Sequence, residues 1–183
     1  VRLSLDFAAR RAIARKRLDA IDPAKSGKST DLYRRDWFRA VYDLAEGDEA
    51  AVPWADKAAH PLLREWLNHE CHPRSLPAEA SGMTARALAN RRALDVGCGL
   101  GDNAEALAAA GAQTTAFDLS DNAIHWARRR FPNSTVDYRA ADLFEPPADW
   151  RGAFDFVHEC YTLQALPNAL LPEAGRALAS FLK

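Results

Sequence analysis

Apolar and polar positions change their spacing along the second half of the chain. Four short β-prone runs lie at residues 93–96, 114–117, 136–140 and 153–157. Helical stretches follow the first two runs, and Gly111 and Pro132 stand where those helices are expected to end. Alternating strands and helices predict a parallel sheet. We therefore expect an α/β fold, a Rossmann-like, doubly wound and mostly parallel sheet, over residues 90–183.

The first ninety residues have a different pattern. Residues 1–31 contain a basic helical stretch at 7–20 and then a polar linker rich in helix breakers. Residues 32–89 are rich in aromatic side chains, namely Tyr33, Trp37, Phe38, Tyr42, Trp54 and Trp66. Amphipathic helices that lay these rings over the sheet edge would give this pattern, and so would a lid over a binding pocket. Either reading predicts an N-terminal helical segment joined to one catalytic domain.

The junction between the first strand and its helix has the densest candidate chemistry. Gly97, Gly99 and Gly101 follow the strand, and Asp95 precedes them. Such a turn brings bare backbone and the N–H groups of a helix N-terminus to a ligand. In the dinucleotide fingerprint the third glycine comes one residue later, and Asp95 would repel a pyrophosphate. A cationic nucleoside cofactor fits better, with an NAD-dependent oxidoreductase as the second enzyme class.

Polar residues also stand at the ends of the later strands. Asp118 ends the second run about 20 residues after the first glycine, where a carboxylate can accept both ribose hydroxyls of an adenosine. Ser120 can cap the following helix, and Asp102 and Asn103 can cap the first. Asp155, inside the expected fourth strand, is predicted to face a polar edge or cap a neighbouring element. Because these strand ends share one edge of a parallel sheet, they predict a single site.

Residues 93–101 resemble motif I of the class I S-adenosylmethionine-dependent methyltransferases, an apolar run, an acid and G-x-G-x-G. The pattern W-x-x-x-x-Y-x-x-x-x-G, followed by Pro53-Trp54, is similar to the thiol, halide and thiopurine methyltransferase group, although Ala55 stands where that group has an acid. The resemblance implies S-adenosylmethionine as cofactor. It assigns cofactor binding to Trp37, Asp95, Gly97, Cys98, Gly99, Asn103, Asp118, Leu119, Ser120, Asp142, Leu143 and His158.

Methyl transfer from a sulfonium needs alignment and exclusion of water more than acid–base groups. The resemblance places the end of the fourth strand at the transferred methyl group. Glu159 and Tyr161, with Trp54 from the lid, are therefore the expected catalytic residues. The acceptor is expected to be a small molecule, with a thiol slightly favoured over oxygen or nitrogen. Oxygen and nitrogen acceptors more often need a base.

Composition and net charge narrow the classes of function and partner that remain. The chain has 183 residues, enough for one good core, and a formal net charge of −1, which does not suggest a nucleic-acid partner. It lacks an apolar run of membrane-spanning length and a disulfide pattern, so a cytoplasmic enzyme is expected. No metal is expected, because His60, His69, Cys71 and His72 lack the paired spacing of a zinc site.

The last residues, 172–183, read as a helix after the fourth strand. The methyltransferase family normally continues with three more strands, so these C-terminal strands are missing here. Phe154, Phe156 and Val157 would then lie on an unpaired edge. We expect a longer natural protein, or a homodimer partner, another chain or the N-terminal segment over this edge. A non-catalytic methyltransferase-like binding subunit is the third function class.

Overall fold

The computed structural model describes residues 6–22, 33–70 and 88–183, and its centre is a parallel sheet of four strands. The strands are β1 (Arg92–Val96), β2 (Gln113–Asp118), β3 (Asp137–Ala140) and β4 (Phe156–Glu159). Their order across the sheet is β3-β2-β1-β4, and all three neighbouring pairs are parallel. The predicted α/β fold of Rossmann type is confirmed.

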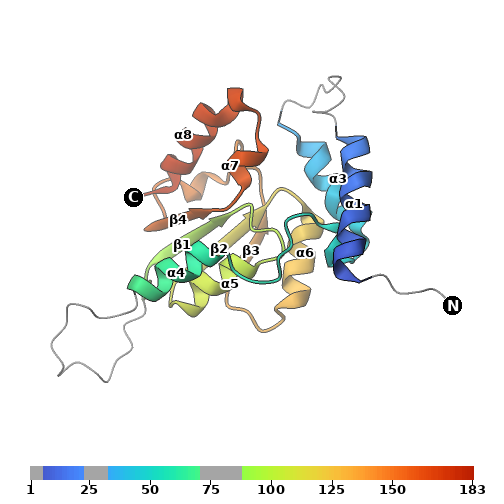
Figure 1. Cartoon of the computed structure of the whole chain (residues 1–183). Coiled ribbons are helices and arrows are strands. Elements are labelled where there is room, and N and C mark those ends of the chain that lie inside the picture. The colour runs from blue at the N-terminus through green and yellow to red at the C-terminus, as the bar shows by residue number, and fades with distance from the viewer. Residues whose placement is uncertain (1–5, 23–32, 71–87) are drawn as a thin grey trace.

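Helices cover both faces of this sheet. In Figure 1, α8 (Leu171–Phe181) lies above the strands, and α5 (Asp102–Ala109) lies below them. The short helix α7 (Thr162–Ala165) leads from β4 towards α8, and α6 (Asp121–Arg130) connects β2 to β3. Single 3-10 turns occur at Ala148–Trp150 and Asn168–Leu170.

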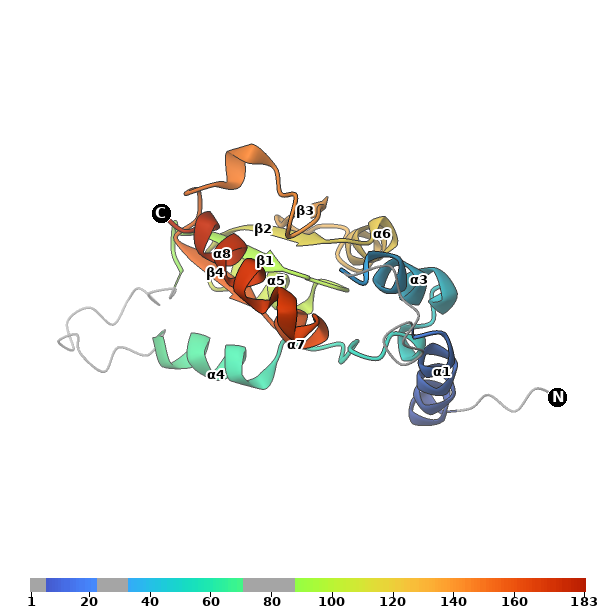
Figure 2. The same ribbon diagram turned by 90° about the horizontal axis from the view of Figure 1, so that it is seen from above.

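The N-terminal part of the chain forms a helical cover, and all of it except α4 lies near α6. It consists of α1 (Phe7–Ile21), α3 (Arg35–Ala45), the 3-10 turn η1 (Glu49–Ala51) and α4 (Pro61–Glu70). Figure 2 shows α1 and α3 together near α6, and α4 apart from them on the β4 side of the sheet. The expected helix at 7–20 is confirmed, whereas residues 23–31 of the expected linker lie outside the described residues. The proposed domain division itself stays a prediction.

Alternation along β1 decides which side chains meet which helices. Leu94 and Val96 pack with Phe117, Phe154 and Phe181 in a core between the sheet and α8. Ala93 points the other way and packs with α5 and α4. Because successive side chains on a strand point to opposite faces, Asp95 belongs to the α5 face.

The caps of the two crossover helices agree in part with the sequence. Gly111 follows α5 with φ +97°, and its N–H donates to the Ala108 carbonyl while Ala112 N–H donates to Leu107, as in a Schellman end. The Ser120 hydroxyl caps α6 by accepting from Ala123 N–H. The N-cap of α5 is Gly101, so the expectation that Asp102 or Asn103 caps this helix is wrong.

The fourth strand begins three residues later than expected. Ala153 and Phe154 are buried under α8 and Trp150 instead of pairing with β1. Phe154 forms a parallel bridge with Leu182, just after α8. Asp155 accepts a hydrogen bond from Arg92 N–H (2.9 Å) and binds Lys183, as expected for a residue that serves a neighbouring element. β4 is one of the two edge strands of the described sheet, and what covers it stays a prediction.

None of the described helices is both long and apolar enough to cross a membrane.

Candidate functional site

A cavity lies where the carboxyl ends of the strands meet the N-terminal cover. Its walls come from the glycine turn after β1, from the ends of β2 and β3, and from the turn after β4. The cover contributes α3 and the segment before α4. Ligands bind at this edge of open α/β sheets, so the strand-end residues come together where the sequence predicts them to.

The glycine turn exposes backbone to this cavity. Gly97 has φ +64°, and a Cβ atom there would lie 2.4 Å from the Thr162 hydroxyl oxygen. Gly99 has φ +54°, and its Cβ would lie 3.3 Å from the Tyr42 hydroxyl. A side chain at Gly97 would therefore displace Thr162, which donates to the Val96 carbonyl. Only glycine leaves the backbone open to a ligand at this position.

Asp118 is the main buried acid of the cavity. Its carboxylate is 7% exposed, and it accepts hydrogen bonds from Gly99 N–H and Ser120 N–H, both at 3.0 Å. Burial raises the pKa of Asp118 to about 6, while the backbone N–H groups of Ser120, Gly99 and Leu119 oppose that rise. A carboxylate has about four acceptor positions, so each oxygen can still accept a ligand hydroxyl.

Asp142 and Leu143 form the wall after β3. Asp142 accepts from Phe144 N–H at 2.9 Å with one oxygen, and the other oxygen accepts from Nε of Arg35 on α3. Leu143 is buried against the α8 core. The strand end and the cover are therefore tied together at this wall of the cavity.

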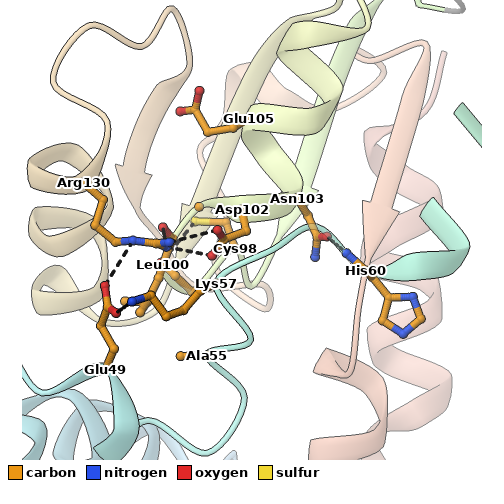
Figure 3. A network of polar contacts seen from close by, with 12 residues as sticks. Glu49, Ala55, Lys57, His60, Cys98, Leu100, Asp102, Asn103, Glu105 and Arg130 are labelled. Atoms are coloured by element: carbon orange, nitrogen blue, oxygen red, sulfur yellow. Dashed lines mark hydrogen bonds and ion pairs between the residues drawn. The ribbon is translucent and has the colours of Figure 1, made fainter. Parts of the chain in front are cut away.

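Tyr161 and His60 face each other at another wall. The Tyr161 hydroxyl lies 3.5 Å from His60 Nε2, and their rings meet edge to face with centroids 5.6 Å apart. Tyr161 is 56% exposed. His60 N–H donates to the Asn103 side chain at 2.8 Å, the contact drawn in Figure 3. That donor is the backbone N–H of His60, which ties the cover to the first turn of α5, while the imidazole lies against Tyr161.

The aromatic residues of the cover divide into a cavity wall and a supporting layer. Trp54 lines the cavity, and its indole N–H donates to the Tyr42 hydroxyl at 2.8 Å. Burial raises the pKa of Tyr42 well above its ordinary value, which keeps it a neutral phenol. Trp37 does not line the cavity. Its ring packs behind, against Phe38 and Trp54, so Trp37 is not part of the cavity wall and its contact with the cofactor stays a prediction.

Asp95 and His158 also lie outside the cavity wall. They are register partners on β1 and β4, and Asp95 Oδ1 lies 2.7 Å from His158 Nδ1. Asp95 is 1% exposed, and burial raises its pKa although His158 opposes the rise. Both side chains lie on the α5 face of the sheet, a consequence of strand alternation that a motif does not reveal. Asp95 therefore supports the turn from below and does not reach into the cavity.

Two further predicted residues have structural contacts instead. Glu159 accepts from Leu163 N–H at 3.2 Å and so satisfies a backbone donor of α7. Ser120 is 2% exposed and caps α6. The predicted residues that do line the cavity are Trp54, Gly97, Cys98, Gly99, Asn103, Asp118, Leu119, Asp142, Leu143 and Tyr161.

A polar network outside the predicted set ties the glycine turn to the cover. Arg130, at the end of α6, donates to both oxygens of Asp102 (2.7 and 2.9 Å) and to the Leu100 carbonyl at 2.7 Å. Glu49 of η1 lies 3.5 Å from Arg130 and 2.5 Å from Lys57. Figure 3 shows this chain of contacts.

The cysteines and histidines do not form a metal centre among residues 6–22, 33–70 and 88–183, where no group of three suitable ligands occurs. Cys71 and His72 lie outside the described residues. Cys98 is buried, and burial raises the pKa of its thiol well above the ordinary value. Its side chain packs with apolar side chains.

Comparison with known proteins supports this geometry. Residues 93–183, about half of the chain, match the family model of a methyltransferase domain. The chain belongs to the class I S-adenosylmethionine-dependent methyltransferases. It is 30% identical over 154 residues to a ubiquinone biosynthesis O-methyltransferase of Aromatoleum aromaticum, which covers 80% of this chain and 53% of the relative. It is 40% identical over 99 residues to the enzyme so named in Bordetella parapertussis, covering 52% and 41%.

Solved structures show the same fold. The magnesium protoporphyrin IX methyltransferase of Synechocystis PCC 6803 with bound S-adenosylhomocysteine has a TM-score of 0.55 at 19% identity, covering 81% of this chain and 68% of that one. A structure that describes conversion of a disulfide bond into a thioacetal group during echinomycin biosynthesis has a TM-score of 0.62 at 24% identity, covering 82% and 56%. This methyltransferase chain spans about half the length of the curated relatives it matches.

Proposed function

We propose that the cavity binds S-adenosylmethionine and that the protein transfers its methyl group to a hydroxyl of a small molecule. One observation carries the proposal: a single cavity brings the bare glycine turn, Asp118 and Asp142 together with Trp54 and Tyr161. The first three suit an adenosine, and the last two are aromatic groups beside it. A cationic sulfonium gains from such surroundings.

The residues present fit the cofactor. Asp118 has acceptor capacity left for ribose hydroxyls, and Asp142 has acceptor capacity left for the exocyclic amine of an adenine. The glycine turn offers backbone without steric hindrance. When bound, the cofactor supplies a methyl group on a positively charged sulfur. The protein's own contribution is to orient this group and to exclude water.

The hydroxyl acceptor is supported by the names of the relatives, which are O-methyltransferases. Nothing in these relatives supports the thiol acceptor or the thiol, halide and thiopurine subgroup that the sequence pattern suggests. In the proposed step the acceptor oxygen bonds to the methyl carbon, the carbon–sulfur bond breaks, and the hydroxyl proton leaves to a base. His60 and Tyr161 are the titratable side chains that meet at the cavity wall and can handle that proton.

The two alternatives are less favoured. Asp95 does not line the cavity and so does not argue against a pyrophosphate there. An NAD-dependent oxidoreductase is less favoured because the matched family model and the curated relatives are methyltransferases. A non-catalytic binding subunit would not need His60 and Tyr161 to meet across 101 positions of sequence. The cytoplasmic location stays a prediction from composition.

Methyl transfer from labelled S-adenosylmethionine to a matched phenol, thiophenol and aniline tests this proposal. We expect transfer to the phenol and little to the other two. Tyr161→Phe and His60→Gln should each lower kcat by about 100- to 10,000-fold, since general acid–base groups contribute on that order. His125→Gln, on an exposed position of α6, is the matched control and should keep full activity. Transfer to thiophenol alone would contradict the hydroxyl acceptor, and no transfer with tight cofactor binding would favour the binding subunit.

A further inference from the structure

Arg35, the first residue of α3, reaches from the cover to the wall after β3. Its Nε donates to Asp142, and its Nη2 lies 3.1 Å from Glu145 Oε1. Its guanidinium lies 4.6 Å from the centre of the Tyr33 ring. That ring in turn meets Phe144 edge to face at 4.7 Å. Two sequence segments more than 100 residues apart therefore close together over one end of the cavity.

These contacts fix the direction of the Asp142 carboxylate without using all of its acceptor positions. One oxygen of Asp142 accepts from Phe144 N–H, and the other accepts from Arg35. Each oxygen keeps one further acceptor position, since a carboxylate has about four. The Asp142 side chain is 17% exposed and that of Arg35 is 28% exposed, so solvent screens the pair only in part.

Arg35 also balances two neighbouring acids. Asp142 and Glu145 both bind its guanidinium, and a β-bridge pairs the backbones of the two acidic residues. Removing the arginine would leave both carboxylates without their shared donor. The Asp142 side chain would then lose one of the two contacts that fix its direction. Arg35 thus holds the Asp142 carboxylate at this wall of the cavity as a hydrogen-bond acceptor with a fixed direction.

We propose that Arg35 is a positioning residue that sets the base specificity of the cofactor site, by holding the Asp142 carboxylate in a fixed direction as an acceptor for a 6-amino purine. The assignment rests on the proposed function, in which Asp142 meets the adenine. A 6-oxo purine presents a carbonyl oxygen in place of the amine, and two acceptors facing each other repel. The pair formed by Arg35 and Asp142 therefore selects adenine over hypoxanthine nucleosides.

Isothermal titration with S-adenosylhomocysteine and S-inosylhomocysteine tests the role of Arg35. The wild type should bind the adenosyl compound more tightly by about 10- to 100-fold, the range for a hydrogen bond to a charged group. Arg35→Gln and Asp142→Asn should each remove most of this preference by weakening the adenosyl compound. The inosyl compound should bind these variants as well as it binds the wild type, or better. Arg39→Gln, one turn further along α3 and half exposed, is the matched control and should keep the preference.

The possible outcomes are separable. Equal weakening of both ligands by Arg35→Gln would show a merely structural role and overturn the assignment. An unchanged preference in Arg35→Gln, with Asp142→Asn losing it, would also overturn it, while leaving the cofactor site intact. If the wild type binds neither ligand, the proposed function fails and the assignment fails with it. Circular dichroism of each variant confirms that the chain has folded.

Discussion

At the scale of single residues, the cavity depends on an acid in an unusual setting. Asp118 is almost fully buried, yet two backbone N–H groups point at it and one of them belongs to the glycine turn. The turn and the acid therefore hold each other in place before any ligand arrives. Such preorganisation lowers the cost of ordering the site on binding.

The raised pKa of Asp118 predicts a pH dependence of binding. In the proposed complex, ribose hydroxyls donate to the ionised carboxylate of Asp118, whose pKa is about 6. Below that value the affinity for S-adenosylhomocysteine should fall by up to about tenfold per pH unit, because a proton must leave before the ligand binds. Titrations between about pH 5 and about pH 8, a range that contains the pKa of Asp118, measure this slope. Asp118→Asn should bind weakly and without the slope, and a wild-type affinity that stays constant down to the lowest pH would contradict the role.

The raised pKa of Asp118 also makes the free energy of unfolding depend on pH. The pKa of Asp118 in the folded chain is above its value of 3.8 in the unfolded chain, so the folded form binds the proton more tightly. This group therefore stabilises the fold at low pH, and that contribution is lost as the pH rises through about 6. Urea unfolding of Asp118→Asn should show less loss of stability over this window than the wild type. An identical pH profile in both proteins would contradict the assignment of the pKa.

Two glycines predict opposite effects of adding a methyl group. Gly97→Ala must adopt φ +64° and displace Thr162, so it should lower the free energy of unfolding by about 2 kcal/mol or more. Gly175→Ala, inside α8 with open space around it, should raise it by about 0.5–1 kcal/mol. Denaturant unfolding of both variants measures the difference. A neutral Gly97→Ala would show that the turn tolerates a side chain.

At the scale of elements, the order of strands and helices was predictable because Gly111 and Pro132 mark where helices end. The start of β4 was not, since Ala153 and Phe154 are as apolar as strand residues but pack under α8. Periodicity alone cannot separate a buried loop residue from a buried strand residue. The face of Asp95 was missed for a related reason, because the motif gives its position but not the pairing with His158.

The contacts between the cover and the core could not be predicted from one sequence. Arg35 and His60 act through partners about 100 residues away, Asp142 and Tyr161, and no local pattern encodes such a pairing. The aromatic content of the cover indicated a wall, and Trp54 does form one. It did not distinguish Trp54 from Trp37, which packs one layer behind.

The network around Arg130 predicts coupling between α6, the glycine turn and η1. Arg130→Ala removes three hydrogen bonds to Asp102 and Leu100, so it should lower the free energy of unfolding by about 1–3 kcal/mol. It should also weaken S-adenosylhomocysteine binding, because the turn loses support. Arg129→Ala, exposed on the same helix, is the control and should change little. Equal stability of the two variants would show that the network contributes nothing.

At the scale of the whole molecule, the N-terminal cover and the methyltransferase core share the cavity. Each supplies walls that the other lacks, from Tyr33 to His60 on one side and from Val96 to Leu166 on the other. A ligand held by both parts should stabilise them together. At a concentration 100 times its Kd, S-adenosylhomocysteine should add about 2.7 kcal/mol to the free energy of unfolding. Thermal unfolding in one transition with a raised Tm is the expected result, and a shift in only part of the signal would contradict a shared site.

The central claim is that the bare glycine turn and Asp118 form a binding site for a sulfur nucleoside and not for a dinucleotide. Calorimetric titration of the wild-type chain with S-adenosylhomocysteine, and separately with NAD, measures this most directly. The account predicts saturable heat with one equivalent of S-adenosylhomocysteine and none with NAD. Saturable heat with NAD, and none with S-adenosylhomocysteine, would contradict it.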